Sequence, residues 1–149
     1  MASDPAAEAW ALLSQVFMAN RAHFLRVGQQ LDLHPMQFHA LRLLEPGAAK
    51  SMRELADSLI CDASNVTGIV DRLEERGLIE RRAVAHDRRV KLLALTPAGE
   101  DLREQALSRM AEPPDQVRAL PLEDQRALRD ALQRVVAQLE ETKPVGAGG

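Results

Sequence analysis

The sequence has 149 residues, of which 46% are hydrophobic, and its net charge is −3 at pH 7. This length suits one domain with a single hydrophobic core. The only cysteine, Cys61, excludes an intramolecular disulfide framework and fits a reducing compartment. The sequence contains no apolar run that could span a bilayer and no secretion signal, so we expect a cytoplasmic protein.

The charge is distributed unevenly along the chain. Residues 72–91 contain seven basic and four acidic side chains, a local charge of +3, which leaves −6 for the rest. A local basic patch can meet phosphate groups while an acidic body elsewhere aids solubility, although a solvated charge run has the same composition. The basic side chains are Arg72, Arg76, Arg81, Arg82, Arg88, Arg89 and Lys91.

Residues 6–31 are predicted to form a long helix, because apolar residues recur at alternating spacings of three and four. This heptad pattern is typical of a helix that packs along another helix. Asn20 interrupts the pattern, either to define the register of a helix pair or at a locally solvated position. Pro35 separates this helix from the next. The pattern comprises Trp10, Leu13, Phe17, Asn20, Phe24, Val27 and Leu31.

Two short helices are predicted next, over residues 35–44 and 52–59. The second begins with a capping box formed by Ser51 and Glu54. After a short turn, Asp62 is expected to cap a helix over residues 63–76, which Gly77 ends in the left-handed conformation. This helix buries Val66, Ile69, Val70 and Leu73 and leaves Ser64, Asn65, Thr67, Gly68, Asp71 and Arg72 outside.

Two extended runs, 78–84 and 90–96, are predicted to form a β-hairpin whose loop, residues 85–89, is polar and basic. Thr96 and Pro97 are predicted to begin a helix that runs to Met110. A last helix is expected over residues 122–141, and residues 142–149 are expected to be a disordered tail. The last helix carries the apolar residues Leu128, Leu132, Val135, Val136 and Leu139.

These elements predict a mainly α (α+β) fold, a winged helix-turn-helix with long N- and C-terminal dimerisation helices. Residues 35–96 form the DNA-binding domain, and residues 6–34 and 97–141 form the helical dimerisation region. Small polar side chains on the second helix of the motif suit approach to base edges in the major groove, and the basic hairpin suits the minor groove.

The chain resembles the MarR family of bacterial transcriptional regulators over nearly its whole length. The resemblance rests on residues 55–59, on residues 62–79, on the sequence Asp87-Arg88-Arg89 and on residues 95–99. It implies a homodimer on a pseudo-palindromic DNA operator. Family members commonly act as repressors, and many release DNA when they bind a small aromatic or phenolic effector or when a cysteine is oxidised.

The resemblance also implies which residues bind DNA. Ser64, Asn65, Thr67 and Gly68 occupy the groove-facing positions, and Arg72 occupies a phosphate-contacting position. Asp87 and Arg89 match the D-x-R motif of the wing, in which the arginine enters the minor groove and the aspartate holds its side chain. His86 and Arg88 lie beside them at the wing tip. Position 68 is often larger and basic in the family, so Gly68 is a departure.

The family's effector crevice lies between the first, second and fifth helices, which makes Trp10, Phe17, Met36 and His39 the candidate effector-binding residues. Cys61 is either a small apolar filler or an oxidation switch near a helix N-terminus. The latter would make the protein a redox-responsive repressor.

We expect no cofactor and no metal, because His23, His34, His39 and His86 do not form a metal-ligand spacing with Cys61. No nucleophile–base pair or Gly-rich phosphate loop indicates an enzyme. The sequence therefore predicts a homodimeric DNA-binding transcriptional regulator, a repressor released by a small aromatic effector. The alternative outside DNA binding is a winged-helix scaffold for protein interactions, which exposed apolar residues on helix 63–76 would favour.

Overall fold

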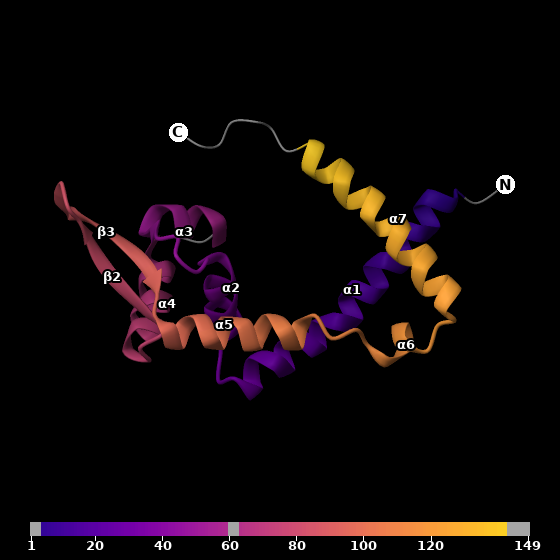
Figure 1. Cartoon of the computed structure of the whole chain (residues 1–149), viewed down its shortest axis with the longest axis horizontal. Helices are drawn as coiled ribbons and strands as arrows, with labels where there is room; N and C mark the ends of the chain where they lie inside the picture. The colour runs from indigo at the N-terminus through magenta and orange to yellow at the C-terminus, as the bar shows by residue number, and fades with distance from the viewer. Residues whose placement is uncertain (1–3, 60–62, 143–149) are drawn as a thin grey trace. The chain divides into compact units, whose positions relative to one another are not determined.

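The computed structural model describes residues 4–59 and 63–142, and it divides the chain into two compact units, residues 1–111 and 112–149. None of the helices in these described ranges is long and apolar enough to cross a membrane. The elements, all but β1 labelled in Figure 1, are α1 (Pro5–Gln30), α2 (Pro35–Leu43), β1 (Lys50–Ser51), α3 (Met52–Leu59), α4 (Ala63–Glu75), β2 (Ile79–Val84), β3 (Asp87–Leu95), α5 (Pro97–Met110), α6 (Asp115–Arg118) and α7 (Leu122–Glu141).

Local capping signals explain where several helices begin. The Ser51 hydroxyl accepts the backbone N–H of Glu54, and the Glu54 carboxylate accepts that of Ser51, which confirms the predicted capping box. Thr96 caps α5 in the same way, through the N–H of Gly99. Gly77 ends the α4 segment with φ of 69°, in the left-handed region as predicted.

The sheet differs from the predicted hairpin in two respects. It has three antiparallel strands in the order β1-β3-β2, because Lys50 and Ser51 pair with Leu93 and Leu92. Two residues are too few to show a strand period in the sequence, so β1 was not predicted. The predicted C-terminal boundary of the loop over residues 85–89 is wrong. Pairing continues to Asp87, and only residues 85 and 86 form the turn.

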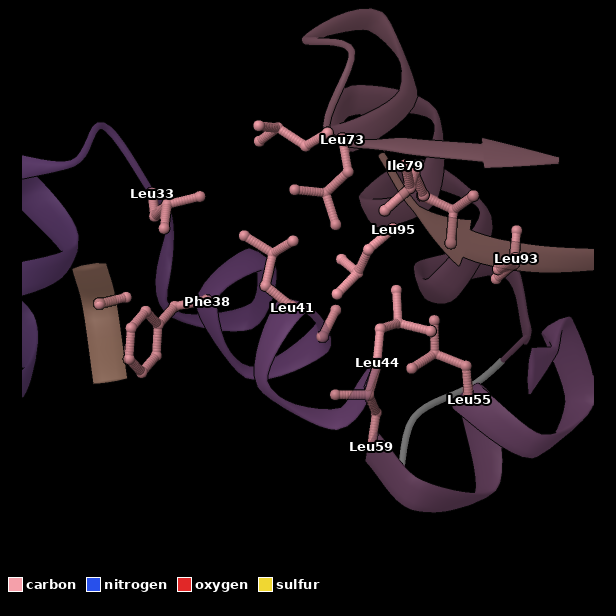
Figure 2. Packing of buried hydrophobic residues seen from close by; sticks show 14 of the residues in the cluster. Leu33, Phe38, Leu41, Leu44, Leu55, Leu59, Leu73, Ile79, Leu93 and Leu95 are labelled. Carbon is pink, nitrogen blue, oxygen red and sulfur yellow. The ribbon is translucent and has the colours of Figure 1, made fainter. Parts of the chain in front are cut away.

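The core of the first unit lies between the sheet and the helices α2, α3 and α4. Figure 2 shows Leu41, Leu44 and Leu95 converging between these elements, and all three are buried. Val27 from α1 and Ala106 from α5 belong to the same buried cluster. The second half of α1 and the whole of α5 therefore support the winged-helix domain within one unit, and they hold α4 and the β2–β3 hairpin in place.

The two longest helices expose apolar residues. In the first half of α1, Trp10 is 69% exposed and Phe17 is 74% exposed. All 20 residues of α7 are described, and none of them is buried. Thr142 forms the C-cap of α7, so the predicted tail begins no earlier than residue 143, and residues 143–149 lie outside the described part of the chain. The assignment of residues 6–34 and 97–141 to one helical dimerisation region stays a prediction.

Candidate nucleic-acid interface

Helix α4 separates apolar and polar side chains onto opposite faces. Val66, Val70 and Leu73 are completely buried, and Ile69 is half-buried. The opposite face presents small polar groups and one arginine to solvent, a surface that can approach base edges closely. This face matches the sequence prediction, and its exposed residues are Asn65, Thr67, Gly68, Asp71 and Arg72.

Gly68 is not required by packing within the chain. A Cβ atom added at this position would meet no atom within 4 Å. Because glycine costs a helix about 1 kcal/mol relative to alanine, its presence on the exposed face favours a close approach by another molecule. The side chain of Ser64, which precedes this face, is not described, and the predicted N-cap Asp62 lies outside the described residues.

The hairpin of β2 and β3 forms a wing with an irregular tip. Ala83 pairs with Lys91 and Val84 pairs with Asp87, so three residues of β3, at positions 88–90, are extra relative to β2. Such a bulge bends the strand and redirects its side chains. His86, Arg88 and Arg89 are all exposed there. The bulge thus places two adjacent guanidinium groups at the far end of the wing.

Three arginines of the basic segment have partners within the chain. Arg76 donates hydrogen bonds to the backbone carbonyls of Asp32 and Leu31, the latter at 3.3 Å. Arg81 forms ion pairs with Asp71 and Glu74 of α4, and Arg82 pairs with Glu80 of its own strand. From the sequence all three counted as part of the basic patch. Only the partner of Arg82 lies two residues away, and the contacts of Arg76 with carbonyls 44 and 45 residues away and of Arg81 with Asp71 10 residues away leave no local signal.

The remaining basic residues are available to bind phosphate. Within residues 4–59 and 63–142, no carboxylate lies in ion-pair distance of their side chains. All of them are exposed, one on the polar face of α4 and the others on the wing. A positive surface that spans both elements is the electrostatic pattern of a nucleic-acid interface. These residues are Arg72, Arg88, Arg89 and Lys91.

The comparisons with known proteins agree with this geometry. The family model described as the MarR family matches residues 33–91, from the start of α2 into the wing. The winged-helix domain belongs to the MarR family. The regulator MhqR of Bacillus subtilis is 27% identical over 88 residues, which cover 59% of this chain, and the chain spans only 61% of that relative's length.

Solved MarR-type structures match more of the chain. The transcriptional regulator Tm0710 of Thermotoga maritima has 25% identity and a TM-score of 0.76, over 91% of this chain and 96% of its own. A structure of NadR in complex with 4-hydroxyphenylacetate has 25% identity and a TM-score of 0.65, over 96% of both chains. The MarR family consists of transcriptional regulators and not of enzymes.

The wing of this MarR-family domain departs from the expected D-x-R arrangement. The Asp87 carboxylate accepts the backbone N–H of Arg89 at 2.9 Å. Within the described residues it forms no ion pair with the Arg89 guanidinium. The expectation that Asp87 holds the side chain of Arg89 is therefore corrected for the free protein. Asp87 shapes the backbone of the bulge and leaves the guanidinium free.

The four predicted effector-binding residues are not brought together within a single copy of the chain. Met36 and His39 lie on α2, whose Phe38 ring packs edge-on against Phe24 of α1 at 4.6 Å between ring centroids. Trp10 lies 14 residues before Phe24 on the same helix, which is about 21 Å along its axis. Trp10 and Phe17 are exposed, so any site that combines them with α2 needs a second chain.

An apolar recess that was not predicted from the sequence lies between α1 and α2. Its volume is about 180 Å³, which is comparable with an engineered cavity of about 150 Å³ that binds benzene. Phe24 was recognised only as part of the heptad pattern, and the packing of α2 against α1 was needed to reveal the recess. The lining residues are Phe24, Leu25, Gly28, Gln29, Leu33, Pro35 and Phe38.

Two of the described histidines have structural roles. His34 is the N-cap of α2, and the His23 ring donates to the carbonyl of Arg109 at 3.0 Å. Cys61, the candidate redox residue, lies outside the described residues, so the oxidation switch stays a prediction. Within the described ranges, no group of three His, Asp or Glu side chains is placed to hold a metal ion.

His39 gives a testable pH dependence. Burial, and then the positive charge of Arg42, lower the pKa of His39 from its usual value of 6.5. Its Nδ1 atom accepts a hydrogen bond from Arg42 at 3.2 Å, which only the unprotonated nitrogen can do. The folded state therefore binds fewer protons than the unfolded state at mildly acidic pH, and the free energy of unfolding should fall as the pH drops below about 6.5.

Urea unfolding from about pH 7.5 to about pH 5.5 measures this dependence. The variant His39→Gln should lose part of the decline, whereas His86→Gln, at the exposed wing tip, should retain all of it. Identical pH profiles for the wild type and His39→Gln would show that His39 protonates equally well in both states.

Proposed function

We propose that this protein is a transcriptional regulator that binds duplex DNA as a homodimer and acts in the cytoplasm. The observation that carries the proposal is the combined surface of α4 and the wing, in a MarR-family domain, where unpaired basic side chains flank a small polar helix face. Asn65 and Thr67 are suited to reading base edges, and Arg72 to binding phosphate. Arg89 is suited to the minor groove.

Polar chemistry on α4 favours DNA over the protein-scaffold alternative. A helix that docks on a protein presents apolar anchor residues at helical spacing. The large apolar side chains of α4 instead point into the core, and the exposed positions from Asn65 to Arg72 are polar, charged or glycine. This distribution supports a nucleic-acid partner.

The exposed apolar residues on α7 support the homodimer. A 20-residue helix with no buried residue gains little stability from packing within its own chain. Leu128, Leu132, Val135 and Leu139 recur at spacings of four, three and four, and they are 36–62% exposed. Spacings of this kind form a seam between two helices, and a second copy of the chain provides an equivalent surface.

The variant Leu132→Glu should weaken dimerisation, because it places a charge in the apolar seam. Analytical ultracentrifugation should show a shift toward monomer, and footprinting should show loss of protection at two half-sites about 10 base pairs apart. Gln133→Glu, the neighbouring position on α7, adds the same charge away from the seam and should remain dimeric. A monomeric wild type that protects one half-site with full affinity would contradict the homodimer.

We also propose that the regulator is a repressor and that a small aromatic acid releases it from DNA. The support is the apolar recess between α1 and α2, together with the similar protein NadR, whose structure is a complex with 4-hydroxyphenylacetate. A ligand that binds better to a dimer whose α4 helices cannot reach both half-sites lowers DNA affinity. DNA then lowers ligand affinity by the same factor.

Titration with salicylate and 4-hydroxyphenylacetate, followed by Trp10 fluorescence, tests this release with and without DNA. Trp10 is the only tryptophan, so its signal reports on α1. We expect ligand binding to weaken when Leu25, an exposed residue that lines the recess, is changed to Ala, and when His39 is changed to Gln. Binding that saturates without any change in DNA affinity would exclude these acids as effectors.

Selection of bound fragments from random duplex DNA is the experiment that tests the function itself. We expect enriched sequences with two related half-sites, and an affinity that falls steeply with salt concentration because phosphate contacts release counterions. Recovery of no duplex above background at low salt would reject DNA binding.

A further inference from the structure

The outer part of the wing has few contacts with the core. Strand β1 pairs with β3 only at Leu92 and Leu93, so the sheet continues toward the tip as a two-stranded ribbon. From residue 82 to residue 91, every side chain is exposed except that of Val84, which is half-buried. Two-stranded ribbons are marginally stable and strongly twisted by themselves. Core packing therefore does not determine the direction of the outer wing.

Arg81 lies opposite Leu93 in the last part of the three-stranded sheet, just before the two-stranded ribbon begins, and its side chain is on the face toward α4. Strand β2 alternates, with Ile79 buried, Glu80 exposed, Arg81 partly buried and Arg82 exposed. The Arg81 guanidinium forms an ion pair with Asp71, and its Nε atom lies 3.5 Å from Glu74 Oε2. Asp71 and Glu74 are three residues apart on α4, so they lie on the same side of that helix. One guanidinium thus spans two carboxylates of the helix that faces DNA.

We propose that Arg81 is a positioning residue, which fixes the direction of the wing relative to α4 so that both elements reach DNA together. This proposal rests on the proposed DNA-binding function. Arg81 does not itself bind phosphate, because Asp71 and Glu74 engage its charge. Its side chain is 28% exposed, and the contact joins β2 of the wing to α4.

Arg82 provides a matched control in the same strand. It carries the same charge and lies on the opposite face, and it pairs with Glu80 two residues away. Its side chain is 61% exposed, and its ion pair does not connect the wing to α4. Loss of Arg82 removes one positive charge from the wing without releasing the wing from the helix.

A double-mutant cycle between Arg81 and Arg89 tests the proposal through DNA affinity. In the wild-type background, Arg89→Ala removes the contribution of a correctly placed wing. Arg81→Ala should weaken binding by about tenfold for each wing of the dimer, the cost expected when only about a tenth of the wings have the binding direction. In that background Arg89→Ala should have a much smaller further effect, because the two residues act through the same contact. In the Arg82→Ala background, the effect of Arg89→Ala should be unchanged.

The paired variant Asp71→Asn with Glu74→Gln releases Arg81 without removing it. It should also reduce the effect of Arg89→Ala, even though loss of two negative charges favours DNA binding in general. Arg81→Lys, whose single ammonium cannot span both carboxylates, should have an intermediate effect. Additive effects of Arg81→Ala and Arg89→Ala, each with an equal loss of salt dependence, would instead identify Arg81 as a phosphate contact and overturn the proposal.

Wing direction can also be measured without DNA. Spin labels at His86→Cys and Gln105→Cys, in a Cys61→Ser background and diluted with unlabelled protein, report the distance from the wing tip to α5. We expect a narrow distance distribution for the wild type and for Arg82→Ala, and a broad one for Arg81→Ala. An unchanged distribution in Arg81→Ala overturns the proposal. A broadened distribution in Arg81→Ala supports the positioning role of Arg81, even if the protein binds no duplex DNA. Failure to bind DNA would reject only the proposed function.

Discussion

Replacement of Arg89 by alanine is expected to lower the affinity for the selected duplex DNA by about a hundredfold or more, because each wing arginine is worth about 1–3 kcal/mol and a dimer has two wings. Arg89 is exposed on the bulge at the wing tip, and its guanidinium has no ion-pair partner in the described part of the chain. Its loss removes nothing from the core, so the melting temperature should remain close to that of the wild type.

Fluorescence anisotropy over a range of salt concentrations measures this effect. The variant should show a shallower dependence of affinity on salt, because fewer counterions are released. Arg82→Ala, whose side chain is already paired with Glu80, should lose much less affinity. Asp87→Ala should be milder than Arg89→Ala, since it frees the backbone of the bulge but keeps the guanidinium. An Arg89→Ala variant with wild-type affinity would show that the wing tip does not touch DNA.

The change Gly99→Ala is expected to destabilise the first unit by at least about 3 kcal/mol, which is a large fraction of the stability of a small protein. A Cβ atom at position 99 would lie 1.9 Å from the carbonyl oxygen of Leu78 and 2.9 Å from its carbonyl carbon. That backbone cannot easily move, because the same oxygen accepts the N–H of Thr96 at 3.1 Å. The Thr96 hydroxyl also donates to the carbonyl of Gly77 at 2.5 Å.

The melting temperatures of Gly99→Ala and Gly68→Ala test this prediction, because both variants add one methyl group to a glycine in a helix. Gly68→Ala should leave the protein equally stable or raise its stability by up to about 1 kcal/mol, because alanine favours the helix and the added methyl group meets no neighbour. An equal melting temperature for the two variants would contradict the close approach of α5 to the residues before β2.

The sequence alone determined those parts of the protein that depend on neighbours a few residues apart. Ser51 and Glu54 bond to each other across one turn, and Thr96 reaches the N–H of Gly99, so the beginnings of α3 and α5 were predictable. The period of apolar residues in residues 63–76 separated the buried face of α4, with Val66 and Val70, from the polar face. The candidate DNA-binding surface follows largely from that separation.

Only the tertiary structure decided which charges remain free and how the wing is built. Arg81 pairs with Asp71 of α4, 10 residues before it in the sequence, and Arg76 bonds to carbonyls 44 and 45 residues away. Neither contact has a local pattern, because the partners meet only when β2 packs against α4 and when the end of α4 comes close to the end of α1. The pairing of β1 and the bulge at positions 88–90 depend on strand register, which distant segments establish together.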